Sequence, residues 1–393
     1  MRRSECAACG AALHDFLDLG STPLADRFPA SPGEHEEWYP LVVAVCPRCW
    51  LVQLREVVPD GELFGPDYGF LTGGSPAAVR YFARMAGQLL STYPEQARRL
   101  TVEIACNDGT LLRNFAAAGC RTVGVEPAKP AAAAAAATGL DVIAEPFTRS
   151  LVPAVRGRHG PAGLVLACNV AAHVADPVDF LGGVRDLLAG DGIAVVEFQH
   201  VAELIAGCQF DHVYHEHRFF YSLASFSHIA AIAGLQVTHW RRTPAQGGTL
   251  RVTLAATRSR HMPDPEPWLQ SMTVYDGMQA RAAYIRHRLL DLIDAELSAA
   301  RTVAGYGASA KSATLLNFCG IDADLLPWIE DITPAKTGRF TPGTHIPIIG
   351  PGAPPDTYLL LVWNYLASVL RRERVFLNDG GRFIVPGAVP VIL

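Results

Sequence analysis

The sequence predicts an α/β protein in which a small zinc-binding knuckle domain precedes two Rossmann-like domains. Three observations predict this order: two CxxC pairs near the start, an alternation of strands and helices through the middle, and a second such alternation in the last third. With 393 residues, the chain is longer than one ordinary hydrophobic core requires. We therefore expect three domains, at residues 1–66, 67–245 and 246–393.

The composition indicates a globular protein and argues against two classes of partner. Hydrophobic residues make up 50% of the chain, the formal net charge is −5 and no long basic run is present, so a dedicated nucleic-acid-binding protein is not expected. The segment Met1–Cys6 lacks the apolar region of a signal peptide, and no apolar run approaches membrane-spanning length. We expect a cytoplasmic protein without a membrane partner. The sequence leaves the oligomeric state open, a monomer included.

Four cysteines form two tight pairs, Cys6 with Cys9 and Cys46 with Cys49. A tetrahedral zinc ion needs four soft ligands from two such knuckles, and a closed four-thiolate site has no open position for a substrate. We therefore predict one structural zinc ion. A redox-active CxxC would instead need a thioredoxin-like strand–turn–helix context, which this segment lacks. The other five cysteines stand singly among apolar neighbours and are expected to be reduced core thiols.

A glycine-broken loop at 66–75 precedes a helix predicted over 77–90. Tyr68 and Ser75 lie in this loop, where they can face a ligand. They can equally serve as a loop anchor and a helix cap, and the sequence does not separate these roles.

The middle of the chain alternates strands and helices as a doubly wound sheet does. The first predicted strand, 102–106, ends at the turn Asn107-Asp108-Gly109 before a helix from residue 110, and the second, 122–125, ends at Glu126. Amides at such a turn can meet a cofactor, and a carboxylate closing the second strand can accept both hydroxyls of a ribose. The pattern predicts a nucleotide-type cofactor, although the GxGxxG fingerprint of NAD proteins is absent. The later elements are strands 164–167 and 193–197 and a helix over 177–188.

The segment Asp211–His217 concentrates three imidazoles, a phenol and two carboxylates, and an aromatic run follows at 219–221. An imidazole held by a carboxylate can take a proton in one step and return it in another, so this segment is the candidate for proton transfer. In an extended or turning segment alternate residues share a side, so Tyr214 and Glu216 are expected to face one way and His215 and His217 the other. The alternative is a polar loop whose histidines bond to backbone groups.

The last third repeats the α/β pattern, with a small-residue turn at Gly307–Lys311 between strand 302–306 and a helix ending near 318. Amides at this helix start, the Ser309 hydroxyl and the Lys311 ammonium can bind a phosphate group. Lys336 and Arg339 are further candidates for the same ligand or are simply solvated. The alternative is a tight turn with no ligand. Two further strands are expected at 325–330 and 358–363.

Several motifs carry a resemblance to a known family. Glu103–Gly109, Gly124–Pro127 and Asn169–Val174 resemble the three S-adenosylmethionine signatures of class I methyltransferases. With further motifs, they make nearly the whole chain similar, in order, to the three-domain nucleotide-sugar C-methyltransferases of antibiotic biosynthesis. Those motifs are the two CxxC pairs, Tyr214–His217, Gly305–Lys311 and Pro342–Pro347.

The resemblance implies a class I methyltransferase as the central domain and a TDP-4-keto-deoxysugar as the substrate, methylated at C3. His217 is then the base, Glu216 and Tyr214 orient the sugar and polarise its C4 oxygen, His173 lies near the methyl group, and Tyr68 covers the site. S-adenosylmethionine is expected to contact Ser75, Ala105, Asn107, Asp108, Glu126, Pro127 and Asn169. The sugar nucleotide is expected against the carboxy-terminal domain, near Ser309, Lys311, Lys336 and Arg339.

The chain departs from the family pattern at three places. Ala105 replaces a glycine, Gln246-Gly247-Gly248-Thr249 replaces His-Gly-Gly-Ser, and Arg218-Phe219-Phe220 follows the histidines. These changes leave cofactor use intact and bear more on the identity of the substrate. Two alternatives remain open from the sequence. One is a methyltransferase acting on another carbon acid or on a sugar nitrogen or oxygen, and the other is a zinc-containing binding module with a degenerate cofactor site.

Overall fold

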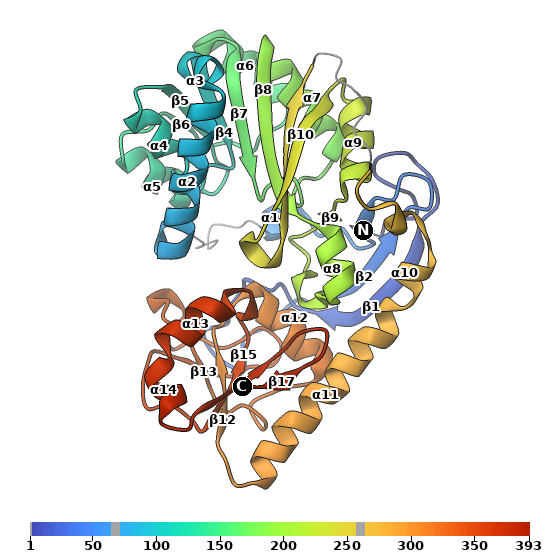
Figure 1. Ribbon diagram of the computed structural model, residues 1–393, viewed down its shortest axis with the longest axis vertical. Helices are drawn as coiled ribbons and strands as arrows, with labels where there is room; N and C mark the ends of the chain where they lie inside the picture. The colour runs from blue at the N-terminus through green and yellow to red at the C-terminus, as the bar shows by residue number, and fades with distance from the viewer. Residues whose placement is uncertain (1, 64–70, 257–263) are drawn as a thin grey trace.

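The computed structural model describes residues 2–63, 71–256 and 264–393, which form three β-sheets (Figure 1). The long helix α11 (Met278–Ser298) runs along one side of the molecule and leads from the middle of the chain into the carboxy-terminal body. None of the helices within these three described ranges is long and apolar enough to cross a membrane.

The first sheet is antiparallel and includes a strand from far along the chain. Its order is β1-β2-β3-β9, and β9 pairs with β3 through Val52 opposite Phe220 and Gln53 opposite Phe219. Because β9 follows the histidine segment directly, the zinc-knuckle sheet anchors the carboxyl end of that segment. The four strands are β1 (His14–Thr22), β2 (Tyr39–Val45), β3 (Val52–Leu54) and β9 (Phe219–Phe220).

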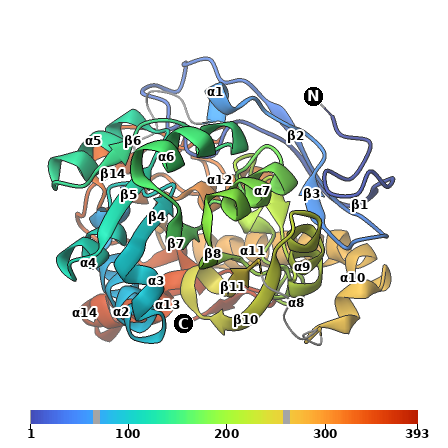
Figure 2. The same cartoon turned by 90° about the horizontal axis from the view of Figure 1, so that it is seen from above.

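The second sheet has seven strands in the order β10-β11-β8-β7-β4-β5-β6, parallel except for β11. Helices α2, α3 and α4 pack on one face, and α6, α7 and α9 pack on the other (Figure 2). This is the Rossmann-like arrangement expected for the middle of the chain. The strands are β4 (Leu100–Ile104), β5 (Arg121–Val125), β6 (Val142–Ile143), β7 (Ala162–Cys168), β8 (Leu188–Gln199), β10 (Gln236–Thr243) and β11 (Thr249–Ala255). The helices are α2 (Pro76–Thr92), α3 (Pro94–Arg99), α4 (Leu112–Ala117), α5 (Lys129–Ala137), α6 (Val152–His159), α7 (Pro177–Leu187), α8 (Val201–Gly207) and α9 (Leu223–Ile232).

The third sheet, in the order β14-β13-β12-β15-β16-β17, is parallel except for its last strand. Its strands are β12 (Val303–Tyr306), β13 (Ile329–Glu330), β14 (Ile348–Ile349), β15 (Thr357–Leu360), β16 (Arg382–Val385) and β17 (Val391–Ile392). The helices of this part are α12 (Ala310–Cys319), α13 (Leu366–Arg372) and α14 (Arg374–Asn378).

Two strands of this last third are shorter than predicted. The amides of Leu325 and Leu326 bond to the Asp322 carbonyl oxygen at 3.2 and 2.9 Å, so these leucines belong to a turn before β13. Strand β15 ends at Leu360, and Trp363 begins a 3-10 turn. In both places the apolar run is longer than the strand, because residues of the adjoining turn are also packed inward.

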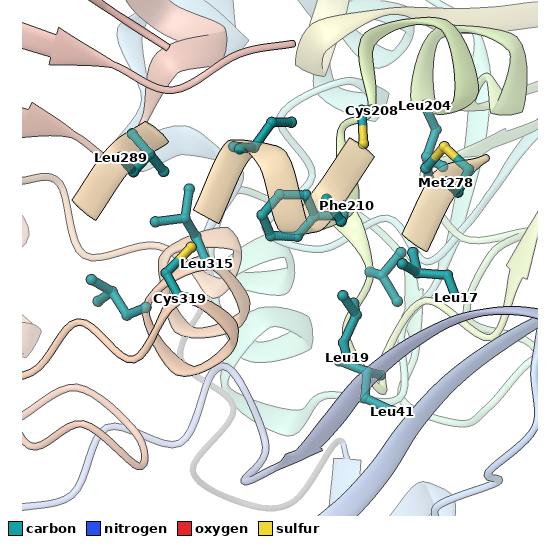
Figure 3. Close-up of a cluster of buried hydrophobic side chains, with 14 of the residues drawn as sticks. Leu17, Leu19, Leu41, Leu204, Cys208, Phe210, Met278, Leu289, Leu315 and Cys319 are labelled. Atoms are coloured by element: carbon teal, nitrogen blue, oxygen red, sulfur yellow. The ribbon is translucent and has the colours of Figure 1, made fainter. Parts of the chain in front are cut away.

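One hydrophobic core is shared by residues that lie in or next to each of the three sheets (Figure 3). Leu17, Leu19 and Leu41 enter it from the first sheet, Phe210 from the 3-10 turn η3 (Phe210–His212), and Leu315 and Cys319 from α12. The histidine segment therefore begins on a core that the knuckle sheet and the carboxy-terminal helix also share. This packing fixes the position of the segment relative to both.

Candidate active site

The four knuckle cysteines converge on one point. Their sulfur atoms all lie within 4.8 Å of one another, with Cys6 Sγ 3.5 Å from Cys49 Sγ and Cys9 Sγ 3.5 Å from Cys46 Sγ. A zinc ion with bonds of about 2.3 Å to tetrahedral sulfur atoms sets their separations at roughly 3.8 Å. The Gln53 side-chain amide also donates to Cys6 Sγ at 3.4 Å, as suits a thiolate. The donor set and its spacing fit zinc.

The cofactor-type turn lies where β4 ends, beside β5 and β7. Glu126, which is 5% exposed, accepts hydrogen bonds from the amides of Asn107 and Ala128 at 2.8 Å each. Burial raises the pKa of this carboxyl group, and those two amides oppose the shift. Asn107 and Asn169 have left-handed φ angles of 50° and 55°, which bend the chain sharply at both strand ends. These side chains, with Asp108 and the exposed Pro127, border one edge of the sheet.

Ala105 adopts a φ of 54° in the same turn. This left-handed conformation favours glycine, because a Cβ atom strains the backbone in this region. The alanine is accommodated, so the turn keeps its shape at some cost in strain.

The loop before α2 contacts the same turn. The amide of Thr72 donates to Asn107 Oδ1 at 2.8 Å, and the amide of Gly73 donates to Asp108 Oδ2 at 2.6 Å. Ser75 accepts from the amide of Ala78 at 3.3 Å, so its hydroxyl caps α2. Ser75 thus has the cap role that the sequence left open, and it lies beside the cofactor turn as well. Tyr68 lies outside the described residues.

The histidine segment is a turn and not an extended strand. The amide of His217 donates to the carbonyl oxygen of Tyr214 at 2.9 Å, and the Tyr214 hydroxyl lies 2.9 Å from His217 Nε2. The expectation that alternate residues share a side is therefore wrong for this pair, because a β-turn brings its first and fourth residues together. Tyr214 and His217 form one polar pair, and both are partly accessible to solvent.

The hydrogen bonds of His217 set its tautomer. Nδ1 lies 2.9 Å from the carbonyl oxygen of His212, which only accepts, so Nδ1 carries the proton and Nε2 presents its lone pair toward Tyr214. Burial, together with the nearby His173, holds the pKa of His217 well below its usual range. The imidazole is therefore neutral at physiological pH, as a general base must be before it acts.

His173 lies against the same imidazole, with ring centroids 5.0 Å apart. Its Nδ1 donates to the carbonyl oxygen of Glu216 at 2.7 Å, and burial lowers its pKa to about 4. His173 follows β7 and His217 precedes β9, so the seven-stranded sheet and the histidine turn meet here.

His215 and Glu216 lie between Tyr214 and His217 in the turn, and both are buried. His215 Nε2 donates to the carbonyl oxygen of Pro40 at 3.2 Å, which ties the turn to the first sheet. Glu216 is 3% exposed and its Oε2 has no hydrogen-bond partner among the described residues. Burial and the nearby Asp26 carboxylate raise the pKa of Glu216 to about 8. Glu216 is therefore largely a neutral carboxylic acid at pH 7.

Asp26 is a site residue that the sequence did not reveal. Asp26 is exposed at the surface, and desolvation by the surrounding protein raises the pKa of its carboxyl group. The charges of Lys311 and Lys336 act on it from the carboxy-terminal part. No motif marks this aspartate, and only the fold brings it to Glu216.

The turn Gly307–Lys311 of the carboxy-terminal part lies close to the histidine segment. Asp211 is buried and accepts from Trp363 Nε1 at 2.5 Å, while the His212 ring lies edge-on to Trp363 with centroids 5.5 Å apart. Lys311 is 9% exposed, and the charges of Asp211 and Asp26 favour its ammonium form against a burial effect that lowers its pKa. The structure brings Lys311 together with these carboxylates. Asp211, His212 and Trp363 lacked an assigned role in the sequence.

The other three phosphate candidates have local partners. Ser309 caps α12 by accepting from the Ser312 amide at 3.4 Å. Lys336 Nζ donates to the carbonyl oxygen of Ala308 at 2.5 Å and lies 4.7 Å from the Phe28 ring centroid. Arg339 donates to the carbonyl oxygen of Phe28 at 2.9 Å and is otherwise exposed. These groups rim the junction between segment 23–37 and the carboxy-terminal sheet.

The altered segment after the histidines also has a structural role. Arg218 is 1% exposed, donates to the carbonyl oxygen of Val58 at 2.7 Å and bonds to the Asp60 carboxylate. Gln246 has a φ of 52°, and its Oε1 lies 3.4 Å from the Asn364 amide. Both departures therefore join neighbouring parts of the chain around the site.

Comparison with known proteins gives matches over three consecutive regions. Residues 6–64 match a zinc-binding domain family, residues 78–240 a methyltransferase domain family, and residues 244–390 a C-methyltransferase C-terminal domain family. The C-methyltransferase NovU of Streptomyces niveus is 34% identical over 410 residues, covering 99% of this chain and 96% of NovU.

Solved structures match slightly less than half of the chain at low identity. The magnesium protoporphyrin IX methyltransferase of Synechocystis PCC 6803 is 11% identical, with a TM-score of 0.35 over 46% of this chain and 79% of its own. The PH0226 protein of Pyrococcus horikoshii OT3 is 13% identical, with a TM-score of 0.39 over 48% of this chain and 95% of its own.

Proposed function

The chain belongs to the three-domain C-methyltransferase family, and from this premise we propose that it methylates C3 of a TDP-4-keto-deoxysugar in antibiotic deoxysugar biosynthesis. The enzyme is an S-adenosylmethionine-dependent methyltransferase, and its amino-terminal domain binds zinc. The observation that carries the proposal is the neutral His217 imidazole, whose Nε2 lone pair is directed at the Tyr214 phenol, with both side chains partly accessible to solvent.

Cofactor binding is proposed at the ends of β4, β5 and β7. Glu126 would accept the ribose hydroxyls, because its two oxygens have lone pairs beyond the bonds from Asn107 and Ala128. Ala105, Asp108, Pro127, Asn169 and Ser75 would border the rest of the molecule. S-adenosylmethionine, when bound, supplies an electrophilic methyl group.

The residues around His217 would prepare the carbon nucleophile. A sugar carbon beside a ketone becomes nucleophilic when a base removes its proton and a donor stabilises the oxygen. His217 Nε2 would take the C3 proton as the sugar displaces the Tyr214 hydroxyl, which then becomes free to donate to the sugar. Glu216, as a neutral acid, would orient the sugar, and His173 would line the methyl-transfer side.

The nucleotide part of the substrate is proposed against the carboxy-terminal domain. Lys336, Arg339 and the amides near Ser309 form its polar rim, and Lys311 was grouped with them from sequence. The four knuckle cysteines are proposed as the zinc ligands, with no part in the chemistry.

The direct test is to incubate the enzyme with methyl-labelled S-adenosylmethionine and a panel of TDP-sugars, and to locate the methyl group by NMR. We expect transfer to C3 of a 4-keto-deoxysugar and no transfer to sugars that lack the ketone. A methyl group on oxygen or nitrogen would identify the other class of methyltransferase. Absence of transfer to every sugar would favour a binding module.

A further inference from the structure

Lys311 lies at the start of α12 and faces the histidine segment. Its side chain is 9% exposed, and Thr314, one turn later on the same helix face, donates from Oγ1 to the carbonyl oxygen of Val213 at 2.7 Å. The helix is thereby fixed to the residue that precedes Tyr214. Lys311 therefore points to the turn Tyr214–His217, the catalytic turn, and not to the outer surface.

The Lys311 ammonium has no hydrogen-bond acceptor and no ion-pair contact within the described residues. Asp211 and Asp26 act on it only through their charge. A mostly buried charge without a bonded partner is costly, and such groups are typical of ligand sites. His212, on which the Lys311 charge acts, has a buried Nε2 without a partner in the part of the chain that the structure describes.

Lysine is rare in this chain, which makes its position here more informative. The 33 basic residues include only three lysines, Lys129, Lys311 and Lys336. Lysine presents a compact point charge, whereas the planar guanidinium of arginine suits two parallel oxygens. A compact ammonium suits one oxygen atom of a ligand.

The surrounding charges decide which oxygen this is. The carboxylates of Asp211 and Asp26 and the ammonium of Lys336 act on Lys311 through their charges, and a diphosphate would bring at least two more negative charges beside the two carboxylates. A ketone arrives neutral and acquires a single charge only during the reaction. The Lys311 charge also acts on the His217 imidazole.

From this placement we infer that Lys311 binds the C4 oxygen of the substrate and stabilises its negative charge while the enolate exists. The inference rests on the proposed function. As His217 Nε2 takes the C3 proton, the C–H electron pair forms the C3–C4 double bond and the carbonyl electrons move to the oxygen bound by Lys311. C3 then bonds to the methyl carbon, the electrons of the broken sulfur–carbon bond stay on sulfur, and the ketone re-forms.

The test compares Lys311→Met, which keeps the length of the side chain and removes the charge, with Lys129→Met at an exposed helix start. Removing one donor to a developing oxyanion typically lowers kcat by about 10²- to 10³-fold, and we expect this loss for Lys311→Met in both methylation and C3 proton exchange. Its affinity for TDP, measured by calorimetry, should stay within about threefold of the parent, roughly 0.7 kcal/mol. Lys129→Met should match the parent in every assay.

Two readouts keep the outcomes separate. Unchanged S-adenosylmethionine binding shows that Lys311→Met is folded, and Lys311→Arg, which keeps a charge, should recover part of the exchange rate. A fall of about tenfold or more in TDP affinity, with kcat retained, would overturn the inference and place Lys311 on the diphosphate. If the parent enzyme methylates a heteroatom, the proposed function fails, while the TDP comparison still reports whether Lys311 contacts the diphosphate.

Discussion

Glu216 is the residue whose protonation most directly links the site to pH. Burial and the Asp26 carboxylate raise its pKa to about 8 in the folded protein. A carboxyl group with a raised pKa stabilises the fold fully below its unfolded pKa of about 4.5 and loses that contribution as pH rises through about 8. His173, with a pKa lowered to about 4, acts oppositely, because its contribution is present above about 6.5 and is lost as pH falls through 4.

We predict that Glu216→Gln flattens the dependence of stability on pH between about 4.5 and 8, since glutamine resembles the protonated acid. The parent's free energy of unfolding, from urea titrations across this range, should fall relative to the variant's by up to about 1.4 kcal/mol per pH unit. Glu95→Gln, at an exposed helix position, is the matched control. Parallel curves for the parent and Glu216→Gln would show that Glu216 titrates as an ordinary carboxyl group.

At the scale of residues, the sequence predicted which side chains form the site better than it predicted how they are arranged. The concentration of histidines at 211–217 identified the segment, but the alternation argument separated Tyr214 from His217, which the turn joins. Asp26 lies some 190 residues away in sequence from Glu216, and no local pattern encodes that proximity. Whether each candidate touches cofactor or sugar stays a prediction.

At the scale of elements, the knuckle sheet supports the catalytic turn. Strand β9 completes this sheet beside β3, and His215 bonds to the carbonyl oxygen of Pro40 in β2. A structural zinc site contributes folding free energy directly to the elements that it joins. Zinc is therefore expected to affect methyl transfer through the position of the turn, although it takes no part in the chemistry.

We predict that Cys46→Ser lowers zinc content and that kcat falls by at least about tenfold, while S-adenosylmethionine affinity stays within about twofold. Metal analysis, turnover and calorimetry measure these three quantities. Cys120→Ser, which changes a cysteine outside the knuckles, should retain zinc and turnover. Full zinc content in Cys46→Ser would exclude Cys46 as a ligand, and full turnover without zinc would contradict the supporting role.

The elements themselves were largely predictable, because strand–helix alternation depends on local periodicity. The helix predicted over 77–90 spans Pro76–Thr92, and the strand predicted over 164–167 spans Ala162–Cys168. Pairing across the chain was not predictable in the same way. Nothing local in Phe219 and Phe220 indicates that they join a sheet made from residues 14–54.

At the scale of the molecule, the site lies where three parts of the chain meet. The first sheet supports the turn and the loop between β1 and β2 provides Asp26, the central sheet provides His173 and the cofactor-type turn, and the carboxy-terminal part provides Lys311 and Trp363. The shared core around Phe210 and Leu315 holds these parts in register (Figure 3). The order of the motifs predicted three domains, whereas their convergence is a property of the packed structure.

The central claim is that His217 removes the C3 proton before the methyl group is transferred. Its most direct measurement is proton exchange in D₂O, with the enzyme, a TDP-4-keto-deoxysugar and S-adenosylhomocysteine, which blocks transfer. We predict that deuterium enters C3, followed by NMR, and that His217→Asn slows this entry by about 10²- to 10⁴-fold while both ligands still bind. Exchange at the parental rate in His217→Asn, or no enzyme-dependent exchange at C3 in the parent, would contradict the account.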